Sequence, residues 1–294
     1  SAASDVYKRQ RPLSTEYSVD LMNIETPVVS ATQLRKFYPT RGRQKGGVLA
    51  VESIGFELRQ GNCLGIVGES GSGKTTIAKM LLGIEIPTAG TINVAGRDRS
   101  IPARDSSERR KRGRELQMVF QDPYTSLDPR QTGWSCLREV IQLHFSDQTR
   151  SQVESRILEL GSQVGLSTEQ LRVRPNSLSG GQRQRVAIAR ALASEPQAII
   201  LDEAVSGLDV SIQAQILNLL MDIKRETGVA YLFISHDLAV IRQMAGYVIV
   251  MESGRVVEEG ETARVLDQPK ENYTRMLRES VPGPGWSPKR RNLA

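Results

Sequence analysis

Short runs of apolar residues alternate with longer amphipathic stretches over most of the chain. Four runs are apolar on both faces and rich in β-branched residues, at positions 64–67, 198–201, 231–234 and 247–251. Strands of this kind lie in sheets that helices cover on both sides. Apolar residues recur with helical spacing over 74–82, 182–193 and 212–226. The alternation predicts an α/β fold with a mostly parallel sheet covered by helices.

Two further segments follow a different pattern. Residues 28–35 and 51–58 alternate between apolar and polar positions, and the Gly/Arg-rich stretch 41–47 separates them. This arrangement predicts an antiparallel β edge with a hairpin loop. Residues from about 121 to 178 contain no buried-strand pattern. Helical spacing at 134–144 and 151–164 predicts an inserted α-helical subdomain there.

Composition narrows the class of protein. The chain has 294 residues and a net charge of +6. Its two cysteines argue against a metal cluster and against a disulfide scaffold. No apolar run approaches the roughly 18 residues of a membrane-spanning helix, and the N-terminus lacks the apolar core of a signal peptide. The basic runs 41–45, 104–114 and 289–291 lack interleaved aromatic residues, so they are interpreted as solvated surface instead of a nucleic-acid site.

The most specific motif begins directly after the run 64–67. Residues 68–76 read Gly-Glu-Ser-Gly-Ser-Gly-Lys-Thr-Thr, the phosphate-loop pattern at a strand-to-helix turn. Glycines let the backbone curl so that N–H groups point at phosphate oxygens, and the helix adds the positive end of its dipole. Lys74 supplies a mobile cation, and the Thr75 hydroxyl can coordinate Mg²⁺. The flanking strand and helix favour a nucleoside triphosphate site over a plain Gly-rich turn.

Polar residues follow two other buried strands. Ligands of open α/β sheets gather at the carboxyl ends of the strands. Asp202 and Glu203 follow the run 198–201, where Asp202 can join the Mg²⁺ shell and Glu203 can deprotonate an attacking water. His236 follows the run 231–234 and can donate a hydrogen bond to a γ-phosphate. An acidic surface turn and a structural histidine are the alternative interpretations.

A second glycine-containing turn, here called the signature turn, reads Leu-Ser-Gly-Gly-Gln at 178–182 and opens a helix. Exposed N–H groups at a helix N-terminus and the Ser179 hydroxyl make another anion site. The alternative is an ordinary N-cap by Ser179. Two anion sites in a chain with one phosphate loop need an explanation.

One family accounts for both turns. The phosphate loop, the signature turn, the segment ending at Glu203 and the Ser-His-Asp segment 235–237 have its order and approximate spacing, so residues 28–273 resemble the nucleotide-binding subunits of ATP-binding cassette (ABC) transporters. The resemblance implies a P-loop ATPase in which two subunits pair head to tail around two ATP molecules. The signature turn would then contact the partner subunit's ATP.

The same resemblance assigns three further residues. Gln121 matches the glutamine that contacts Mg²⁺ and the attacking water, and Asp209 lies in the segment matching the dimer-interface loop. The family more often has alanine where this chain has Gly207. Tyr38 matches the aromatic residue that stacks on adenine, although Phe37 could do so instead, and core packing is the alternative for either.

The resemblance therefore implies a complete set of site residues. The expected catalytic residues are Glu203, His236, Gln121 and Lys74. The expected ATP-binding residues are Tyr38, Gly68, Glu69, Ser70, Gly71, Ser72, Gly73, Lys74, Thr75 and Thr76. Those expected to bind ATP in the partner subunit are Ser179, Gly180, Gly181, Gln182 and Asp209. The expected Mg²⁺ ligands are Thr75, Gln121 and Asp202.

Strings at 120–130, 203–215 and 272–277 resemble the ATPase subunits of oligopeptide, dipeptide and nickel importers. This implies a peripheral protein on the cytoplasmic face of a bacterial membrane, with a second ATPase subunit, permease subunits and, indirectly, a solute-binding protein as partners. The alternatives are a phosphonate-metabolism accessory ATPase, a soluble cassette protein acting on nucleic acid or the ribosome, and one half of a longer chain with two cassettes.

The predicted organisation has three parts. Residues 1–26 form a polar tail, whose start is interpreted as partly non-native. The ATPase domain covers 27–270 and includes the helical subdomain at about 121–178. Residues 271–294 form a C-terminal tail of the peptide-importer type, with an end predicted to be disordered.

Overall fold

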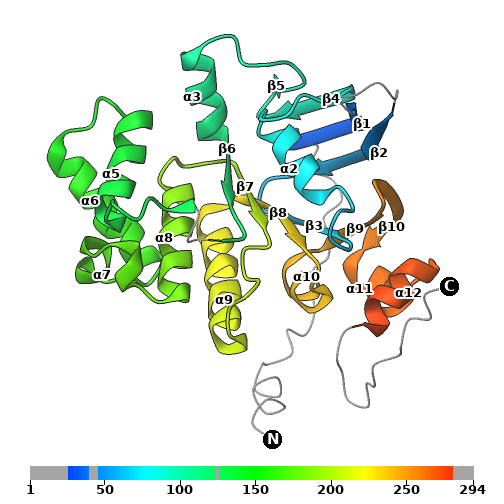
Figure 1. Cartoon of the computed structure of the whole chain (residues 1–294). Helices are drawn as coiled ribbons and strands as arrows, with labels where there is room; N and C mark the ends of the chain where they lie inside the picture. Colours follow the sequence, from blue (N-terminus) through cyan, green and yellow to red (C-terminus); the bar gives the residue numbers. More distant parts are fainter. Residues whose placement is uncertain (1–25, 40–45, 123–125, 281–294) are drawn as a thin grey trace, which may run out of the picture.

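The computed structural model describes residues 26–39, 46–122 and 126–280, which form one ten-stranded sheet with helices on both faces (Figure 1). The strands are β1 Val29–Pro39, β2 Gly47–Leu58, β3 Cys63–Val67, β4 Ala89–Val94, β5 Arg97–Asp98, β6 Leu116–Val119, β7 Ala198–Asp202, β8 Ala230–Ser235, β9 Tyr247–Glu252 and β10 Arg255–Glu261. The helices are α2 Lys74–Leu81, α3 Ser106–Glu115, α5 Gly133–His144, α6 Arg150–Gln163, α7 Thr168–Arg172, α8 Gly180–Leu192, α9 Val210–Thr227, α10 Leu238–Met244, α11 Thr262–Asp267 and α12 Asn272–Glu279, with a 3₁₀ turn η1 at Pro175–Ser177.

The sheet has two parts that differ in strand direction. Its order is β5-β4-β1-β2-β10-β9-β3-β8-β7-β6. β9, β3, β8, β7 and β6 are parallel, whereas β5, β4, β1 and β2 pair antiparallel. β10 joins the parts, because it pairs antiparallel with β9 and contacts β2 through Arg255 and Ser53. The predicted α/β fold with a mostly parallel sheet and an antiparallel edge is confirmed.

Side chains of the central strands alternate between two hydrophobic cores. Cys63 and Val67 of β3 belong to the core that contains α5–α10. Leu64 and Ile66 of the same strand belong to the core formed with α2 and the antiparallel strands. Because successive strand residues point to opposite faces, α2 and α8 cover opposite faces of the sheet.

Several element boundaries differ from those predicted. β1 extends to Pro39, so Phe37 and Tyr38 lie inside the strand. β2 begins at Gly47, where the Phe37 ring packs so closely that a Cβ at position 47 would lie 2.3 Å from it. The pattern did not reveal β4, β5, β6 or β10, nor the helices α3, α10, α11 and α12. The loop residues 40–45 lie outside the described part of the chain.

Among the described residues of the region 121–178, α5, α6 and α7 are helices, and Figure 1 shows them gathered with α8 at one side of the sheet. Their inward residues Leu137, Ile157 and Leu171 share one core with Val186 of α8. The domain boundaries stay predictions, and the expectations for residues 1–25 and 281–294 fall on parts that the structure does not describe.

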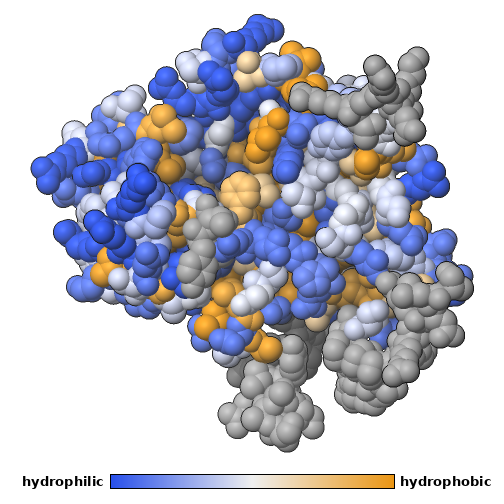
Figure 2. Space-filling model, viewed as in Figure 1, coloured by the Kyte–Doolittle hydropathy of each residue, from blue (hydrophilic) through white to orange (hydrophobic). Residues whose placement is uncertain are grey.

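The described surface is mostly polar. On the face shown in Figure 2, apolar residues form separate spots among polar ones. Among helices of the described residues, none has the length and apolar character that crossing a membrane requires.

Candidate active site

The phosphate loop leaves the carboxyl end of β3 and enters α2 through glycines that no larger residue could replace. Gly73 is the N-cap of α2 with φ 102°, and a Cβ there would lie 2.3 Å from the carbonyl oxygen of Ala50. A Cβ at Gly68 would lie 2.2 Å from the carbonyl oxygen of Met251. The sequence therefore needs glycine at both positions for the loop to fold against β2 and β9.

The Lys74 side chain fills the inside of this loop. Its Nζ donates hydrogen bonds to the carbonyl oxygens of Gly68 (2.7 Å) and Glu69 (2.8 Å) and to the Ser72 hydroxyl (3.2 Å). Burial lowers the pKa of Lys74, although the carboxylates of Glu203 and Asp202 act in the opposite direction. A buried ammonium of this kind is an electrostatic partner for an anion inside the loop.

Asp202 has one satisfied and one unsatisfied oxygen. Its Oδ2 accepts a hydrogen bond from the Thr75 hydroxyl at 3.2 Å, whereas buried Oδ1 has no hydrogen-bond partner among the described residues. Burial raises the pKa of Asp202, and the Thr75 hydrogen bond lowers it by a smaller amount. Carboxylate and hydroxyl oxygens are the ligands that Mg²⁺ prefers, so the orphaned oxygen fits a Mg²⁺ ligand.

Protein ligands alone would not complete a metal shell here. In the described chain, histidine, cysteine, aspartate and glutamate side chains form no cluster of three or more that could hold a metal ion. Mg²⁺ binds through one or two carboxylates together with phosphate oxygens and water in sites of this kind. Thr75 and Asp202 therefore suit a Mg²⁺ ion that arrives with a nucleotide.

Glu203 and His236 meet at the ends of β7 and β8. His236 Nδ1 lies 2.6 Å from Glu203 Oε2, and the Glu203 side chain is largely buried while that of His236 is 62% exposed. Glu203 adopts φ 53°, and its N–H donates to the Ile234 carbonyl at 2.9 Å. A left-handed backbone at a residue other than glycine is strained, and such strain is typical of functional positions.

The signature turn forms the first turn of α8, which begins at Gly180 instead of the predicted position 182. Ser179 is the N-cap, and Gln182 completes a capping box: Ser179 N–H donates to Gln182 Oε1 at 2.9 Å, and Gln182 N–H donates to Ser179 Oγ at 3.3 Å. The helix extends further because this box stabilises its start. Ser179 is therefore an N-cap, as the alternative interpretation expected. The amides at the very start of the helix still have no acceptor within the helix itself.

The signature turn packs against the segment that follows β7. A Cβ at Gly181 would lie 2.6 Å from Ile212 Cγ2, and one at Gly180 would lie 3.5 Å from Leu208 Cδ2. Asp209, the N-cap of α9, is exposed and makes no side-chain capping hydrogen bond. Gly207 adopts φ 73°, which glycine tolerates better than alanine. The signature turn and the segment 208–212 thus lie against each other.

Two other predicted site residues come from segments outside these groups, one after β6 and one within β1. Gln121 is exposed just beyond β6, and no hydrogen bond joins it to Thr75 or Asp202 in the described structure. Tyr38 is partly buried in β1, with Lys36 Nζ 4.8 Å from its ring centre, and Phe37 is 39% exposed. Both aromatic residues therefore remain candidates for stacking.

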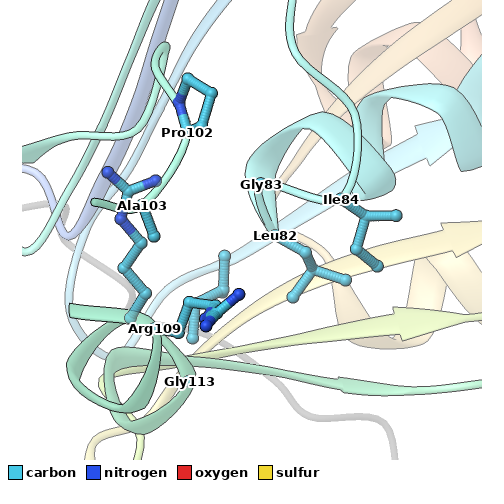
Figure 3. A pocket seen from close by; sticks show the side chains of 9 residues that line it. Leu82, Gly83, Ile84, Pro102, Ala103, Arg109 and Gly113 are labelled. Carbon is cyan, nitrogen blue, oxygen red and sulfur yellow. The ribbon is translucent and has the colours of Figure 1, made fainter. Parts of the chain in front are cut away.

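A hollow of about 420 Å³ lies between the end of α2 and helix α3 (Figure 3). Leu82, Ile84, Pro102 and Arg109 are among the residues that line it. Because α2 begins at the phosphate loop and runs away from it, this hollow is at the opposite end of the helix. It contains none of the residues predicted to bind ATP.

Two residues near the phosphate loop were missed in the sequence. Gly254, in the turn between β9 and β10, donates its N–H to the Ser72 carbonyl at 3.1 Å. Tyr273 of α12 accepts a hydrogen bond from the Glu69 N–H at 3.0 Å. Ser253-Gly254 is a turn signal, but nothing in the sequence indicates that this turn or Tyr273 contacts a loop so distant in the chain.

Comparisons with known proteins identify the family of this chain. A family model described as ABC transporter matches residues 51–206. The oligopeptide transport ATP-binding protein OppD of Mycobacterium bovis is 43% identical over 288 residues, covering 96% of this chain and 46% of OppD. The dipeptide transport ATP-binding protein DppF of Escherichia coli is 40% identical over 262 residues, covering 88% of this chain and 78% of DppF. The chain thus spans about half the length of OppD.

A solved structure gives the same result for the fold. The dimeric, post-hydrolysis structure of the ATP-binding cassette MJ0796 with ADP and Pi aligns with a TM-score of 0.71 at 27% identity, covering 80% of this chain and 98% of that one. The motifs, the fold and these matches together show that the chain belongs to the ABC transporter family.

Proposed function

We propose that this chain is the ATP-hydrolysing subunit of an ABC importer for peptides or related small solutes. One observation carries the proposal: Lys74, Thr75, Asp202, Glu203 and His236 are joined around the phosphate loop by hydrogen bonds, short contacts and electrostatic interactions. These are the groups that binding a triphosphate and activating water require. The names of OppD and DppF support the peptide cargo.

In the proposed site, the phosphate loop holds the ATP phosphates. The Lys74 ammonium keeps its hydrogen bond to the Gly68 carbonyl and exchanges its contacts with Glu69 and Ser72 for negatively charged phosphate oxygens. Thr75 and Asp202, with Gln121 on closure, would hold Mg²⁺, which would neutralise negative charge on the phosphate oxygens. Tyr38 stacks on adenine.

Glu203 acts as the general base. Its carboxylate lies beside the Asp202 position and can take a proton from the water that attacks the γ-phosphate. His236 is largely exposed and in contact with Glu203, so it can hold that carboxylate in place and also donate a hydrogen bond to the γ-phosphate.

The second half of the ATP site comes from another subunit. Within one chain, the phosphate loop opens α2 on one face of the sheet and the signature turn opens α8 on the other. Ser179, Gly180, Gly181, Gln182 and Asp209 would contact ATP bound to the partner. The dimeric state of the MJ0796 cassette supports pairing of two subunits.

The partners follow from the proposed transport role. A second ATPase subunit, identical or related, completes the ATP sites, and permease subunits anchor the pair to the cytoplasmic face of the bacterial membrane. An extracytoplasmic solute-binding protein delivers cargo to the permease. ATP binding closes the dimer and moves the helices α5–α7 together with the permease, and hydrolysis reopens it.

The first test is hydrolysis by the purified chain. Phosphate release should require both ATP and Mg²⁺, and chelation with EDTA should stop it while leaving the fold intact by circular dichroism. Reconstitution with its permease subunits should give ATP-dependent uptake of a labelled peptide. Metal-independent phosphate release would contradict the proposed mechanism, and ATP hydrolysis without peptide uptake would contradict the proposed cargo.

A further inference from the structure

A tyrosine from the last described helix reaches the phosphate loop. The Glu69 N–H donates to Tyr273 Oη at 3.0 Å, although 204 positions separate the two residues in the chain. The Tyr273 side chain is buried, with 8% exposed, and its ring belongs to the main hydrophobic core. Its hydroxyl therefore occupies a fixed position beside the loop.

Helix α12 is itself held firmly. The Glu258 carboxylate of β10 accepts hydrogen bonds from the N–H groups of Lys270 and Glu271, at 2.9 and 3.2 Å, just before the helix begins. Near its end, Arg278 donates to the Asp267 carbonyl of α11 at 2.9 Å. Figure 1 shows α12 beside α11 in the C-terminal part of the fold. Tyr273 is thus presented to the loop by an anchored element.

The hydrogen bond falls on one particular peptide unit. The N–H of Glu69 and the C=O of Gly68 belong to the same planar group, so fixing one fixes the direction of the other. The Gly68 oxygen accepts a hydrogen bond from Lys74 Nζ at 2.7 Å. Tyr273 and Lys74 therefore hold the two ends of a single peptide plane.

We propose that Tyr273 is a positioning residue of the ATP site, whose hydroxyl orients the Gly68–Glu69 peptide and thereby the Lys74 ammonium. This inference rests on the proposed ATPase function. Without the hydroxyl, the peptide can rotate, and the acceptor that places Lys74 in the loop moves with it. The geometry of the phosphate loop then depends on the C-terminal helix.

The test compares two tyrosine-to-phenylalanine variants. Tyr273→Phe removes only the hydroxyl that contacts the loop. Tyr231→Phe is the matched control, because Tyr231 is also buried and its hydroxyl donates to the Leu220 carbonyl at 3.1 Å, within the core. We expect the two variants to have similar unfolding midpoints and only Tyr273→Phe to bind ATP about three- to tenfold more weakly, the usual effect of one hydrogen bond.

Hydrogen exchange without nucleotide gives a second readout. The peptide that contains the Glu69 amide should exchange faster in Tyr273→Phe than in wild type, and at the wild-type rate in Tyr231→Phe. Unchanged ATP affinity or unchanged exchange in Tyr273→Phe would overturn the positioning role. Failure of the wild-type chain to bind ATP would instead contradict the proposed function. The exchange experiment would still test whether the Tyr273 hydroxyl holds the Glu69 amide.

Discussion

The phosphate loop and the signature turn begin alike and differ in their surroundings. Each places glycines at the start of a helix, α2 or α8. The phosphate loop encloses Lys74 and faces Asp202, whose Oδ1 lacks a hydrogen-bond partner in the described structure. In the signature turn, Ser179 and Gln182 satisfy each other through a capping box.

This difference indicates that the two turns have different roles in binding ATP. Lys74 of the phosphate loop, Asp202 as the proposed Mg²⁺ ligand and Glu203 as the proposed general base belong to one chain, so in the proposed mechanism this loop holds a triphosphate by itself. The signature turn offers helix-end amides and a hydroxyl, which suits contact with an anion that is already bound elsewhere. The predictions below test whether the two turns have these different roles.

The largest effect is expected from Glu203→Gln. An amide cannot accept the proton of the attacking water, so turnover should fall by about 10²- to 10⁴-fold, whereas ATP binding persists. Phosphate release and equilibrium ATP binding measure the two quantities. Glu226→Gln, at an exposed position of α9, serves as the control. Normal hydrolysis by Glu203→Gln would remove this residue as the base.

Lys74→Ala should weaken ATP binding itself. Hydrogen bonds to charged groups contribute about 1.5–3 kcal/mol, which corresponds to roughly 10- to 150-fold in affinity. Lys79→Ala removes an exposed lysine from the same helix and should leave affinity unchanged. Titration with ATP measures both, and equal affinities in the two variants would exclude Lys74 from phosphate binding.

The Ser179→Ala variant tests whether Ser179 has a role in turnover beyond capping helix α8. Thr149 caps α6 with Gln152 through the same kind of box, so Thr149→Ala is a matched control. Each substitution should lower the free energy of unfolding by about 1 kcal/mol. Only Ser179→Ala should also lower turnover, by roughly tenfold, through the lost contact with the partner's ATP. Equal turnover in the two variants would make Ser179 a cap and nothing more.

Asp202→Asn should give the smallest effect, on stability. Because burial raises the pKa of Asp202, the folded protein binds this proton more tightly, and the residue's contribution to stability falls as pH rises above the ordinary carboxyl range. The nucleotide-free variant should gain about 0.5–2 kcal/mol at pH 7.

This gain should shrink as the pH falls to about 4, near the ordinary pKa of an aspartate. Urea unfolding at both pH values measures it, with the exposed Asp222→Asn as control. A gain that does not change with pH would contradict the burial argument.

Much of the fold could be predicted because its signals are local. The buried strands β3, β7, β8 and β9 are continuous apolar runs, and α2, α8 and α9 have clear helical spacing. β6 was missed because four residues after the basic helix α3 carry too little pattern to define a strand. β5 has only two residues.

The candidate site was predictable for a related reason. The phosphate loop and Glu203 follow strand ends and Asp202 is the last residue of β7, and position at a strand end can be read from sequence. The left-handed backbone conformation at position 203 could not be predicted, because the residue there is glutamate and not glycine. The contact between Tyr273 and Glu69 depends on how α12 packs, which no local pattern encodes.

The central claim is that each ATP site takes its phosphate loop from one subunit and its signature turn from another. Mixing Lys74→Ala and Ser179→Ala chains tests it most directly, because a mixed dimer then contains one site with both defects and one intact site. The account predicts more phosphate release from the mixture than from the two variants assayed separately. Activity equal to the mean of the separate variants would contradict a shared site.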